Sequence, residues 1–512
     1  MSTKETVKVK DGENTKHRFW LRSIKFINAV MITVPFALCW YLYYADRIWA
    51  PFYSNGDKLV VVMFIALYIM FGKIYSGFTI SINHVAEIVY SQILAILFTN
   101  SIMYFVTWLL TKRLPNPLPM LAALVAECIL SFIWSAIAHA EYFRKFKPIR
   151  TVIVYDMRKG LENLVNSYGL DKRFNIVETH HVSDVVDNLE QSLGKAEAVF
   201  LCGIHSHDRN KIIKYCVKAD IRAYIIPRVG DLLMESAHPI HMFHLPILML
   251  ERYNPTPEYL IIKRAFDILV SGIALIILSP LMIVIAILIR RDGGTAFYRQ
   301  KRLTKNGKEF YVLKFRSMRM DAEKDGVARL SSGENDDRIT PIGHFIRACR
   351  IDELPQLINI LRGDMSIVGP RPERPEIAAD YEKELPEFAL RLQAKAGLTG
   401  YAQVYGKYNT TPNDKLLMDL QYIAKPSFAE DLKIMFATVK ILFMPESTEG
   451  IDANATNAMG DGSFGGGAGK EDSAETEDSA EIEGGAGKED SAETEDSAEI
   501  EDGVEKEDGG DK

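Results

Sequence analysis

The sequence predicts a membrane protein of mixed fold, with a four-helix transmembrane bundle, a small Rossmann-like α/β domain and a mostly α domain that contains a re-entrant membrane helix. Three observations predict this fold. Apolar stretches of membrane length come first, an alternation of strand and helix patterns follows, and a fifth apolar run is interrupted by a proline. A chain of 512 residues is also too long for one domain and fits about three.

After a polar segment at 1–23, the part at 24–140 contains four apolar stretches, at roughly 24–45, 59–80, 87–110 and 119–140. Each stretch is long enough to cross about 30 Å of hydrocarbon as a helix. Basic residues precede the first stretch and follow the fourth. The positive-inside rule therefore predicts that both ends of the bundle lie in the cytoplasm.

The part at 146–250 alternates short apolar runs with helical patterns, which predicts a small parallel sheet in a Rossmann-like domain. The apolar runs are 151–156, 198–203 and 222–228. The loop after the first run lacks the GxGxxG pattern that lets a pyrophosphate approach a helix N-terminus. The nucleotide motif is degenerate, so a spacer domain is favoured over a nucleotide-binding one.

A fifth apolar run, within the part at 260–445, is broken by Ser279-Pro280. Proline removes a helix hydrogen bond and kinks or breaks the helix. Lys263 and Arg264 precede the run, and two arginines follow it. Basic residues at both ends predict that 263–291 enters the membrane, bends at the proline and returns to the cytoplasmic side. An ordinary fifth span is the alternative, and it would place all downstream residues outside the cell.

The adjacent carboxylates Asp352 and Glu353 are the strongest candidates for chemistry. Neighbouring residues on a helix point about 100° apart, so one carboxylate can attack or hold a metal while the other orients it. An acidic pair alone is more often a solvated helix face. Cationic side chains nearby favour a phosphate site instead, because arginine presents a planar fork to phosphate oxygens. These candidates are Lys314, Arg316, Arg338, Arg347, Arg350 and Arg371.

Charge is distributed unevenly along the chain. Residues 446–512 carry 23 acidic side chains and 4 lysines, a net charge of −19, and the remaining residues carry 44 acidic and 56 basic side chains, a net charge of +12. An 18-residue acidic segment at 466–483 repeats without change at 484–501, which predicts a disordered tail. A basic body that flanks apolar segments fits anionic lipids and phosphate substrates, and it argues against nucleic acid as a partner.

Residues 260–445 contain a series of short motifs, at Lys263, Arg264, Asp267, Ser279, Pro280, the segments 298–302 and 314–318, Asp352, Glu353, the segment 363–366, Gly369, Pro370, Arg371, Pro372, Glu373, Gly397, Thr399, Gly400 and Gln403. Taken in order, these motifs resemble those of the bacterial sugar transferases, in particular the long-form monotopic polyprenyl-phosphate hexose-1-phosphate transferases of the undecaprenyl-phosphate glucose/galactose phosphotransferase type. The resemblance covers most of that family's catalytic domain. Lys395 and Lys407 stand where the family commonly has arginine, so the fork geometry is lost there.

The resemblance implies an enzyme that transfers a hexose-1-phosphate from a UDP-sugar, such as UDP-glucose or UDP-galactose, to undecaprenyl phosphate and releases UMP. Asp352 would be the nucleophile that forms a phospho-sugar intermediate, with ping-pong kinetics, and would also hold Mg²⁺, while Glu353 supports it. The candidates for binding substrate phosphate are Arg371, Arg316, Lys314, Arg338 and Arg347.

The resemblance also implies a setting for this activity. The protein would lie in the bacterial cytoplasmic membrane, in contact with membrane lipids, with its catalytic domain on the cytoplasmic face. It would catalyse the first membrane step of exopolysaccharide, capsule or O-antigen biosynthesis. A homodimer through the N-terminal region is part of the same expectation.

Two other functions stay open at this point. A non-catalytic membrane scaffold of a polysaccharide assembly complex would keep this fold, and a lost carboxylate pair would favour it, but the pair is intact. A transporter would carry charges inside its membrane spans, yet the four N-terminal stretches contain few besides Lys73 and Glu127. The eleven histidines lack the accompanying ligand spacing of a metal site.

Overall fold

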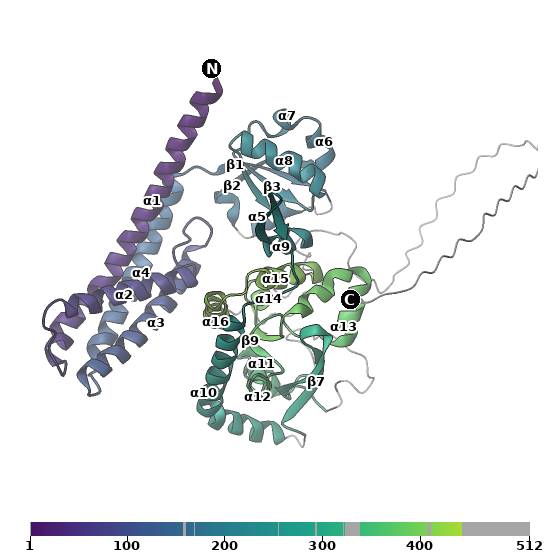
Figure 1. The fold of residues 1–512 in the computed structure, drawn as a ribbon. Helices are drawn as coiled ribbons and strands as arrows, with labels where there is room; N and C mark the ends of the chain where they lie inside the picture. The colour runs from purple at the N-terminus through teal and green to yellow at the C-terminus, as the bar shows by residue number, and fades with distance from the viewer. Residues whose placement is uncertain are drawn as a thin grey trace, which may run out of the picture. The chain divides into compact units, whose positions relative to one another are not determined.

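The computed structural model describes residues 2–156, 160–167, 169–253, 255–291, 294–320, 322, 338–406 and 411–442. The acidic repeats, Lys407 and most of the loop predicted to carry the degenerate nucleotide motif lie outside these residues. Within them, the chain forms an N-terminal set of long helices, a parallel sheet with flanking helices, and a mostly helical third part (Figure 1).

Four long helices make up the N-terminal part, namely α1 (Ser2–Cys39), α2 (Gly56–Ile74), α3 (Val85–Thr111) and α4 (Leu118–Lys145). Two short turns, η1 (Trp40–Tyr44) and η2 (Ala45–Arg47), follow α1. In the bundle, α4 packs against α1 and α3, and α2 packs against the same two helices. Aromatic side chains fill the core, where the rings of Phe36 and Phe64 stack with their centroids 4.2 Å apart. The apolar periodicity of the sequence therefore produces a packed bundle.

Among the described residues, four helices are long and apolar enough to cross a membrane: Lys16–Arg47, α3, α4 and α10 (Pro257–Arg290). The predicted span at 59–80 is not among them. It forms α2, which ends at Ile74 and whose 19 residues include Asp57, Lys58 and Lys73. Length and composition thus bear out three of the four predicted N-terminal spans together with the fifth apolar run.

Polar side chains link the helices inside the bundle. Tyr68 donates a hydrogen bond from its hydroxyl to Asn28 Oδ1 at 2.7 Å, and Asn100 donates from Nδ2 to Glu127 Oε2 at 2.6 Å. Such bonds satisfy polar groups that an apolar surrounding would leave without partners. Glu127, one of the two charges noted in the sequence, is therefore engaged between α3 and α4.

The second part contains a four-stranded parallel sheet with the order β2-β1-β3-β4. This arrangement confirms the predicted small parallel sheet. The flanking helices cover a core of aliphatic side chains contributed by β1 and β3. Its elements are β1 (Ile149–Tyr155), α5 (Leu161–Ser167), η3 (Leu170–Lys172), β2 (Phe174–His181), α6 (Val182–Val186), α7 (Leu189–Leu193), β3 (Ala198–Cys202), α8 (Ser206–Lys218), β4 (Arg222–Ile225) and α9 (Val229–Glu235).

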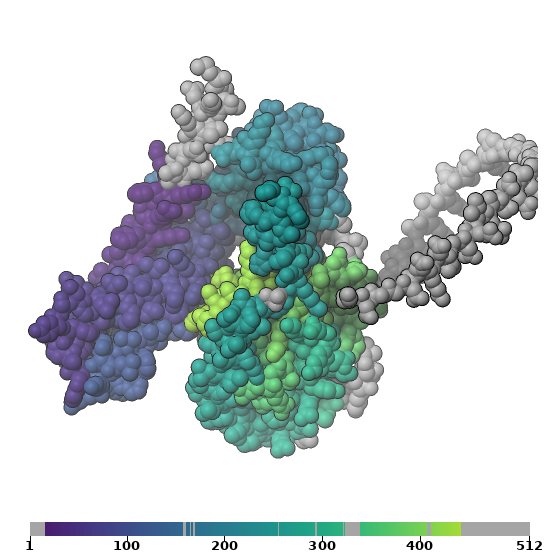
Figure 2. Space-filling model, viewed as in Figure 1, coloured from purple at the N-terminus to yellow at the C-terminus, as the bar shows by residue number. Residues whose placement is uncertain are grey.

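An antiparallel hairpin, β5 (His238–Met242) and β6 (Leu245–Met249), follows the sheet. Large apolar side chains around its turn are exposed, and Phe243 at the tip is 80% exposed. The teal atoms of this hairpin lie uncovered on the face shown in Figure 2. An exposed apolar patch of this kind is typical of an interaction surface.

The third part begins with α10 and is mostly helical, as the sequence predicts. Its core is shared by the strands β8 to β10 and the helices α12, α13, α15 and α16. The elements after α10 are β7 (Phe297–Leu303), η4 (Lys305–Gly307), β8 (Glu309–Phe315), α11 (Pro341–Ala348), η5 (Ile351–Glu353), α12 (Gln356–Arg362), β9 (Ser366–Val368), α13 (Pro375–Glu384), η6 (Pro386–Gln393), β10 (Gly397–Thr399), α14 (Tyr401–Tyr405), α15 (Pro412–Ala424) and α16 (Phe428–Leu442).

The helix α10 bends along its length. It starts at Pro257, where the side chain of Thr256 accepts a hydrogen bond from Tyr259 N, and it contains Pro280. The hydroxyl of Ser279 donates to Ile276 O at 2.8 Å, one turn before the missing proline N–H. Figure 1 shows the ribbon of α10 changing direction part-way along. Only 17% of its most apolar window is buried, so most of the helix offers apolar side chains to its surroundings.

Candidate active site

The two candidate carboxylates lie on the short 3₁₀ turn η5, between α11 and α12. Arg350, just before the turn, has a left-handed backbone with φ of 52°, which ends α11 and redirects the chain. Pro355, just after the turn, precedes the first residue of α12. From the sequence, the pair was expected to lie on a helix. The structure corrects this. The left-handed backbone of Arg350 ends the helix, so Asp352 and Glu353 lie on a tight 3₁₀ turn instead.

Glu353 is held by two cations. Lys314 Nζ, on β8, lies 2.9 Å from Glu353 Oε1, and an Arg371 guanidinium nitrogen lies 3.4 Å from the same oxygen. The glutamate side chain is 15% exposed. Burial alone would raise the pKa of Glu353, but the charges of Lys314 and Arg371 outweigh burial and lower it. Glu353 is therefore a fixed negative charge that orients the two cations.

Asp352 is in the opposite electrostatic situation. Burial raises the pKa of its carboxyl to about 6, with Lys314 and Arg347 partly opposing that effect and the adjacent Glu353 charge adding to it. Two carboxylates whose environments separate their pKa values have different chemical tasks. Asp352 is then the more basic of the pair, and it is ionised at neutral pH.

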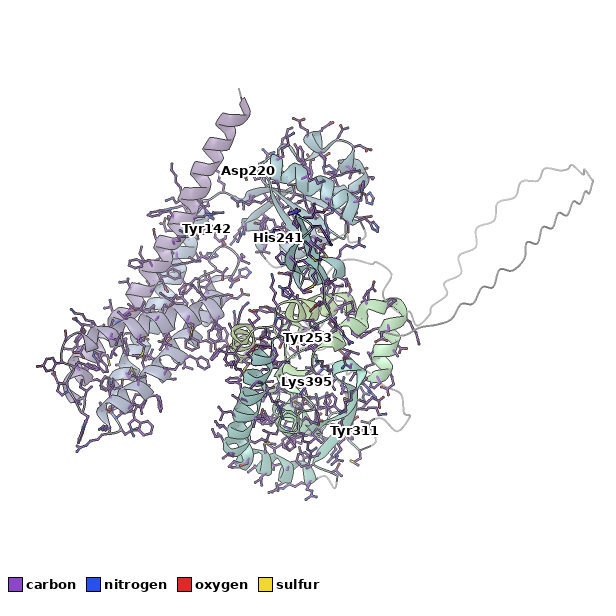
Figure 3. All side chains as sticks on the ribbon, in the orientation of Figure 1. Tyr142, Asp220, His241, Tyr253, Tyr311 and Lys395 are labelled. Atoms are coloured by element: carbon purple, nitrogen blue, oxygen red, sulfur yellow. The ribbon has the colours of Figure 1, made fainter. Side chains whose placement is uncertain are left out.

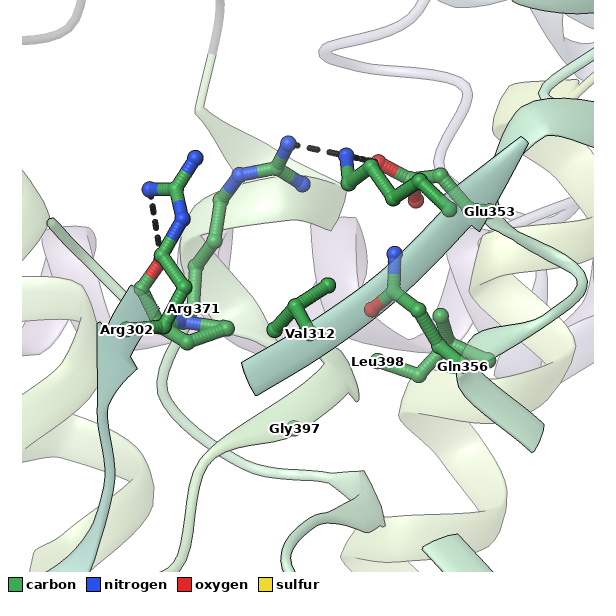
Figure 4. Close-up of a pocket in the computed structure, with 9 residues that line it drawn as sticks. Arg302, Val312, Glu353, Gln356, Arg371, Gly397 and Leu398 are labelled. Carbon is green, nitrogen blue, oxygen red and sulfur yellow. Dashed lines mark hydrogen bonds and ion pairs between the residues drawn. The ribbon is translucent and has the colours of Figure 1, made fainter. Parts of the chain in front are cut away.

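A pocket opens beside the pair (Figure 4). Val312 and Leu398 supply apolar walls, and Arg371 and Lys314 point toward Glu353 across the pocket. Cations gathered around an open space suit the oxygens of a phosphate group. The full lining consists of Arg302, Val312, Lys314, Glu353, Gln356, Arg371, Pro372, Gly397 and Leu398.

The turn that carries Arg371 is held by close backbone contact between β9 and β10. Gly369 N donates to Thr399 O, and Gly397 N donates to Pro370 O, both at 2.9 Å. A Cβ on Gly397 would meet the backbone nitrogen of Gly369, and a Cβ on Gly400 would meet Gly369 O. These three positions exclude side chains because the two backbones touch there. The hydroxyl of Thr399 also forms a hydrogen bond of 2.6 Å with the hydroxyl of Thr438 on α16.

A buried charge network supports the turn from behind. Arg391 donates to Arg371 O at 2.7 Å and lies 2.6 Å from Asp419, and both side chains are almost fully buried. Glu373 lies 3.7 Å from Arg391 and 3.7 Å from Arg302. Together these contacts fix the backbone of Arg371, so that its guanidinium approaches the pocket from a rigid base.

The motif at the start of α10 ties this helix to the rest of the third part. Lys263 Nζ lies 2.9 Å from Asp431 on α16. Arg264 donates to the carbonyls of Ile360 and Leu361 and so caps the end of α12. Asp267 accepts from Ile367 N on β9 at 3.0 Å. The three residues therefore hold α10 against α12, β9 and α16. Gln403, in the late motif, has both side-chain amide atoms buried without a hydrogen-bond partner in the described part of the chain.

The predicted phosphate-binding side chains divide into two groups. Arg371 and Lys314 line the pocket, and Arg347 is close enough to lower the pKa of Asp352. Arg316 is different, because its buried guanidinium donates to Ile289 O and Thr295 O and closes the connection between α10 and β7. A phosphate contact by Arg316 would require these bonds to open. Arg338 lies on the strand-like segment beside Met318, outside the pocket lining.

Sequence reasoning missed two polar lining residues. Arg302 donates to Pro372 O at 3.1 Å and ends the 298–302 motif that was noted only as a match. Gln356 lies four residues after Asp352, about one helical turn further on, which was the available signal. Lys395, labelled in Figure 3, lies two residues before β10, and its pKa is lowered by burial and by the charge of Arg264.

The donor set fits Mg²⁺ only together with a substrate. Among the described residues, no group of three or more histidine, cysteine, aspartate or glutamate side chains is arranged to hold a metal. Mg²⁺ is commonly bound by one or two carboxylates plus substrate phosphates and water. Asp352 can supply one such oxygen ligand, so the residues present are compatible with a metal that arrives with a phosphate substrate.

Comparison with known proteins gives consistent matches to the third part. The model of the bacterial sugar transferase family matches residues 258–445. A UDP-glucose:undecaprenyl-phosphate glucose-1-phosphate transferase of Caulobacter vibrioides is 37% identical over 219 residues, which cover 41% of this chain and 81% of that protein. This relative is thus matched over most of its own length.

Two longer relatives match more partially. A UDP-N-acetylgalactosamine-undecaprenyl-phosphate N-acetylgalactosaminephosphotransferase of Aeromonas hydrophila is 35% identical over 236 residues, 45% of this chain and 55% of that protein. An undecaprenyl-phosphate glucose phosphotransferase of Komagataeibacter xylinus is 38% identical over 236 residues, 44% of this chain and 43% of that protein. The chain spans about half the length of these two relatives.

Proposed function

Since this chain belongs to the bacterial sugar transferase family, we propose that it is a polyprenyl-phosphate hexose-1-phosphate transferase. The proposed reaction moves a hexose-1-phosphate from a UDP-sugar to undecaprenyl phosphate and releases UMP. Its relatives include proteins named as transferases for glucose, galactose and N-acetylgalactosamine on undecaprenyl phosphate. A UDP-hexose, with UDP-glucose or UDP-galactose first, is therefore the proposed donor.

One observation carries the proposal. Two adjacent carboxylates have opposite pKa shifts, and they lie beside a pocket that also holds Lys314 and Arg371. A nucleophile needs to be ionised and still basic, and Asp352 with a pKa of about 6 meets both needs at neutral pH. The fixed charge of Glu353 keeps the cations in position, and their remaining donors suit substrate phosphate.

The proposed mechanism has two displacements at the same phosphorus. An oxygen of Asp352 attacks the β-phosphorus of the UDP-sugar, and the bond from that phosphorus to the bridging oxygen breaks. UMP leaves with the electron pair, and an acyl phosphate that carries the sugar remains on Asp352. A phosphate oxygen of undecaprenyl phosphate then attacks the same phosphorus, and the Asp352 carboxylate is released. Two half-reactions through a covalent enzyme predict ping-pong kinetics.

Arg371 and Lys314 bind and orient the diphosphate in this scheme, because both point into the pocket from rigid backbone. Asp352 and the substrate oxygens would hold Mg²⁺, which when bound neutralises the charge that develops on the leaving phosphate. Arg302 and Gln356 are additional candidates for contacts to the donor, since they line the same pocket.

The proposal includes a membrane topology. The helix α10 would enter the membrane from the cytoplasm, bend near Pro280 and return, with the N-terminal helices spanning the bilayer. The bend of α10, its exposed apolar side chains and the basic residues at both its ends support this arrangement. The pocket would then face cytoplasmic UDP-sugars at the membrane surface, at the first membrane step of polysaccharide synthesis.

A homodimer also belongs to the proposal, with the β5–β6 hairpin as its interface in place of the N-terminal region that the resemblance implies. The exposed apolar tip of the β5–β6 hairpin supports it, because Phe243 and its neighbours would be costly to leave in water. Two-fold dimers are the commonest soluble oligomers, and in them the same patch of each copy pairs with the other.

The decisive experiment measures UMP release from a panel of UDP-sugars with undecaprenyl phosphate and Mg²⁺, for the wild type and for Asp352→Asn. Release that depends on the lipid and is lost in the variant supports the transferase and identifies the sugar. Full activity in the variant rules out Asp352 as nucleophile. No release from any sugar would favour the scaffold, and sugar flux across the bilayer without lipid-linked product would favour a transporter.

A further inference from the structure

A second pocket lies where the N-terminal helices meet the α/β domain. Three segments line it: the connection between α2 and α3, the C-terminal part of α4, and the segment between α5 and β2. The pocket is partly open to solvent. None of its lining residues lines the candidate active site.

The lining of this pocket has one sign of charge. Four of its ten residues are His84, His139, Lys172 and Arg173, and none of the ten is a carboxylate. A cleft lined by one sign of charge concentrates ions of the opposite sign. Cations brought together without a carboxylate between them also repel one another, and a bound anion relieves that repulsion.

Part of the lining is fixed without any ligand. Arg173 donates from one guanidinium nitrogen to Ser81 O at 3.1 Å and to Ser81 Oγ at 2.5 Å. Its carbon Cζ lies 5.2 Å from the ring centroid of Phe174. The Nε of Arg173 is buried and has no hydrogen-bond partner in the described part of the chain. A buried donor without a partner is costly, and an anion bound in the pocket that Arg173 lines would place a compensating negative charge near its guanidinium.

The N-terminal helices and the α/β domain touch at one wall of this pocket. Gly169 has a left-handed backbone with φ of 61°, and a Cβ at this position would lie only 2.6 Å from His84 Cε1. The backbone at Gly169 therefore packs directly on the imidazole. His84 also precedes the 27-residue helix α3, whose first N–H groups receive no side-chain cap from it. The N-terminus of a long helix adds positive potential at the same place.

We propose that this pocket binds a phosphate-bearing anion, either the headgroup of an anionic lipid or a soluble phosphate compound. The shared chemistry is a phosphate group that accepts hydrogen bonds from Lys172 and from the two imidazoles. With the proposed topology, the pocket lies at the cytoplasmic end of the bundle, where lipid headgroups are within reach. The inference concerns a site separate from the transferase pocket, and binding here is measurable without turnover.

The test uses the full-length protein in nanodiscs of phosphatidylglycerol and phosphatidylcholine. Titration with inorganic phosphate, followed by calorimetry, measures a soluble ligand. Mass spectrometry of the lipid that stays bound after extraction measures enrichment of phosphatidylglycerol over phosphatidylcholine. The variant His139→Ala/Lys172→Gln removes one cation and one imidazole hydrogen-bond donor, and Lys172→Gln alone changes only an exposed side chain. Either variant should weaken phosphate binding about tenfold, or abolish the lipid enrichment, since each contact is charge-assisted.

Arg144→Gln is the matched control. Arg144 lies on α4, is 78% exposed and pairs with Glu141 outside the pocket. Saturable phosphate binding that only the pocket variants lose identifies a soluble ligand, and lipid enrichment that only they lose identifies a headgroup. The proposal is overturned if the wild type shows neither, or if Arg144→Gln reduces binding as much as the pocket variants do, because surface charge would then explain the effect.

Discussion

Replacing Lys314 with glutamine should shift the pH dependence of turnover. Lys314 is the largest charge that favours the ionised form of both Asp352 and Glu353. The pKa of Asp352 is already raised to about 6 by burial, so the nucleophile gains its charge, and activity rises, as the pH increases through about 6. Without the lysine, Asp352 stays protonated to a higher pH. Glu353 remains ionised in the variant because Arg371 and Arg350 still lower its pKa.

The magnitude follows from the geometry. An opposite charge within a few ångströms lowers the pKa of a carboxyl by at least about one pH unit, so its loss moves the Asp352 pKa to about 7 or higher. At pH 6 the ionised fraction then falls from about one half to about one tenth, which is a loss of about fivefold, whereas at pH 8.5 this effect disappears. Any loss of activity in Lys314→Gln that remains at high pH measures the contribution of Lys314 to binding the substrate phosphate.

The assay is kcat/KM for UMP release between pH 5 and pH 9. Lys301→Gln is the control, because Lys301 lies on the adjacent strand β7 and pairs with Glu309 at 2.9 Å, away from the carboxylate pair. For Lys301→Gln, the acidic side of the profile of kcat/KM against pH should coincide with that of the wild type. An unchanged acid limb in Lys314→Gln, with activity lowered equally at every pH, would refute the electrostatic reasoning.

Three further predictions concern stability and assembly. Gly397→Ala should lower the thermal midpoint and abolish activity, because the new Cβ meets the Gly369 backbone; a midpoint within error of the wild type would contradict the close contact. Asp431→Ala should destabilise the fold by about 3–5 kcal/mol in denaturant titrations, since it leaves Lys263 without its buried partner. A loss of stability below about 1 kcal/mol would show that the Lys263 ammonium group becomes hydrated in the variant. Phe243→Ser should convert a dimer to a monomer in multi-angle light scattering without reducing the thermal midpoint, and an unchanged mass would remove the hairpin from the interface.

Local signals made the helical parts of the fold predictable. A long apolar run interrupted by Ser279-Pro280 predicted α10 and its bend, because hydropathy and the missing proline N–H act within one helix. The start at Pro257 was missed, although Thr256-Pro257 is a common N-terminal pattern. The span at 59–80 was wrong in extent, since charges at both ends of α2 leave a shorter apolar helix.

Tertiary contacts decided what the sequence could not. The 3₁₀ turn under Asp352 depends on the left-handed backbone of Arg350, a conformation that arginine rarely adopts and that no local pattern announces. Arg316 and Arg371 carry the same charge in the sequence. Packing directs the first to buried carbonyls and the second to the pocket. The neighbourhood of the carboxylate pair was predictable from motifs, but the division of labour among its cations was not.

The measurement that tests the central claim most directly is trapping of the covalent intermediate. The wild type, incubated with the UDP-sugar and Mg²⁺ but without undecaprenyl phosphate, should release about one UMP per chain and gain the mass of one hexose phosphate. Peptide mapping should place that mass on Asp352, and Asp352→Asn should show neither the burst nor the adduct. A wild type that turns over with lipid present, yet shows no burst and no adduct without it, would contradict the account and indicate direct transfer between the two substrates.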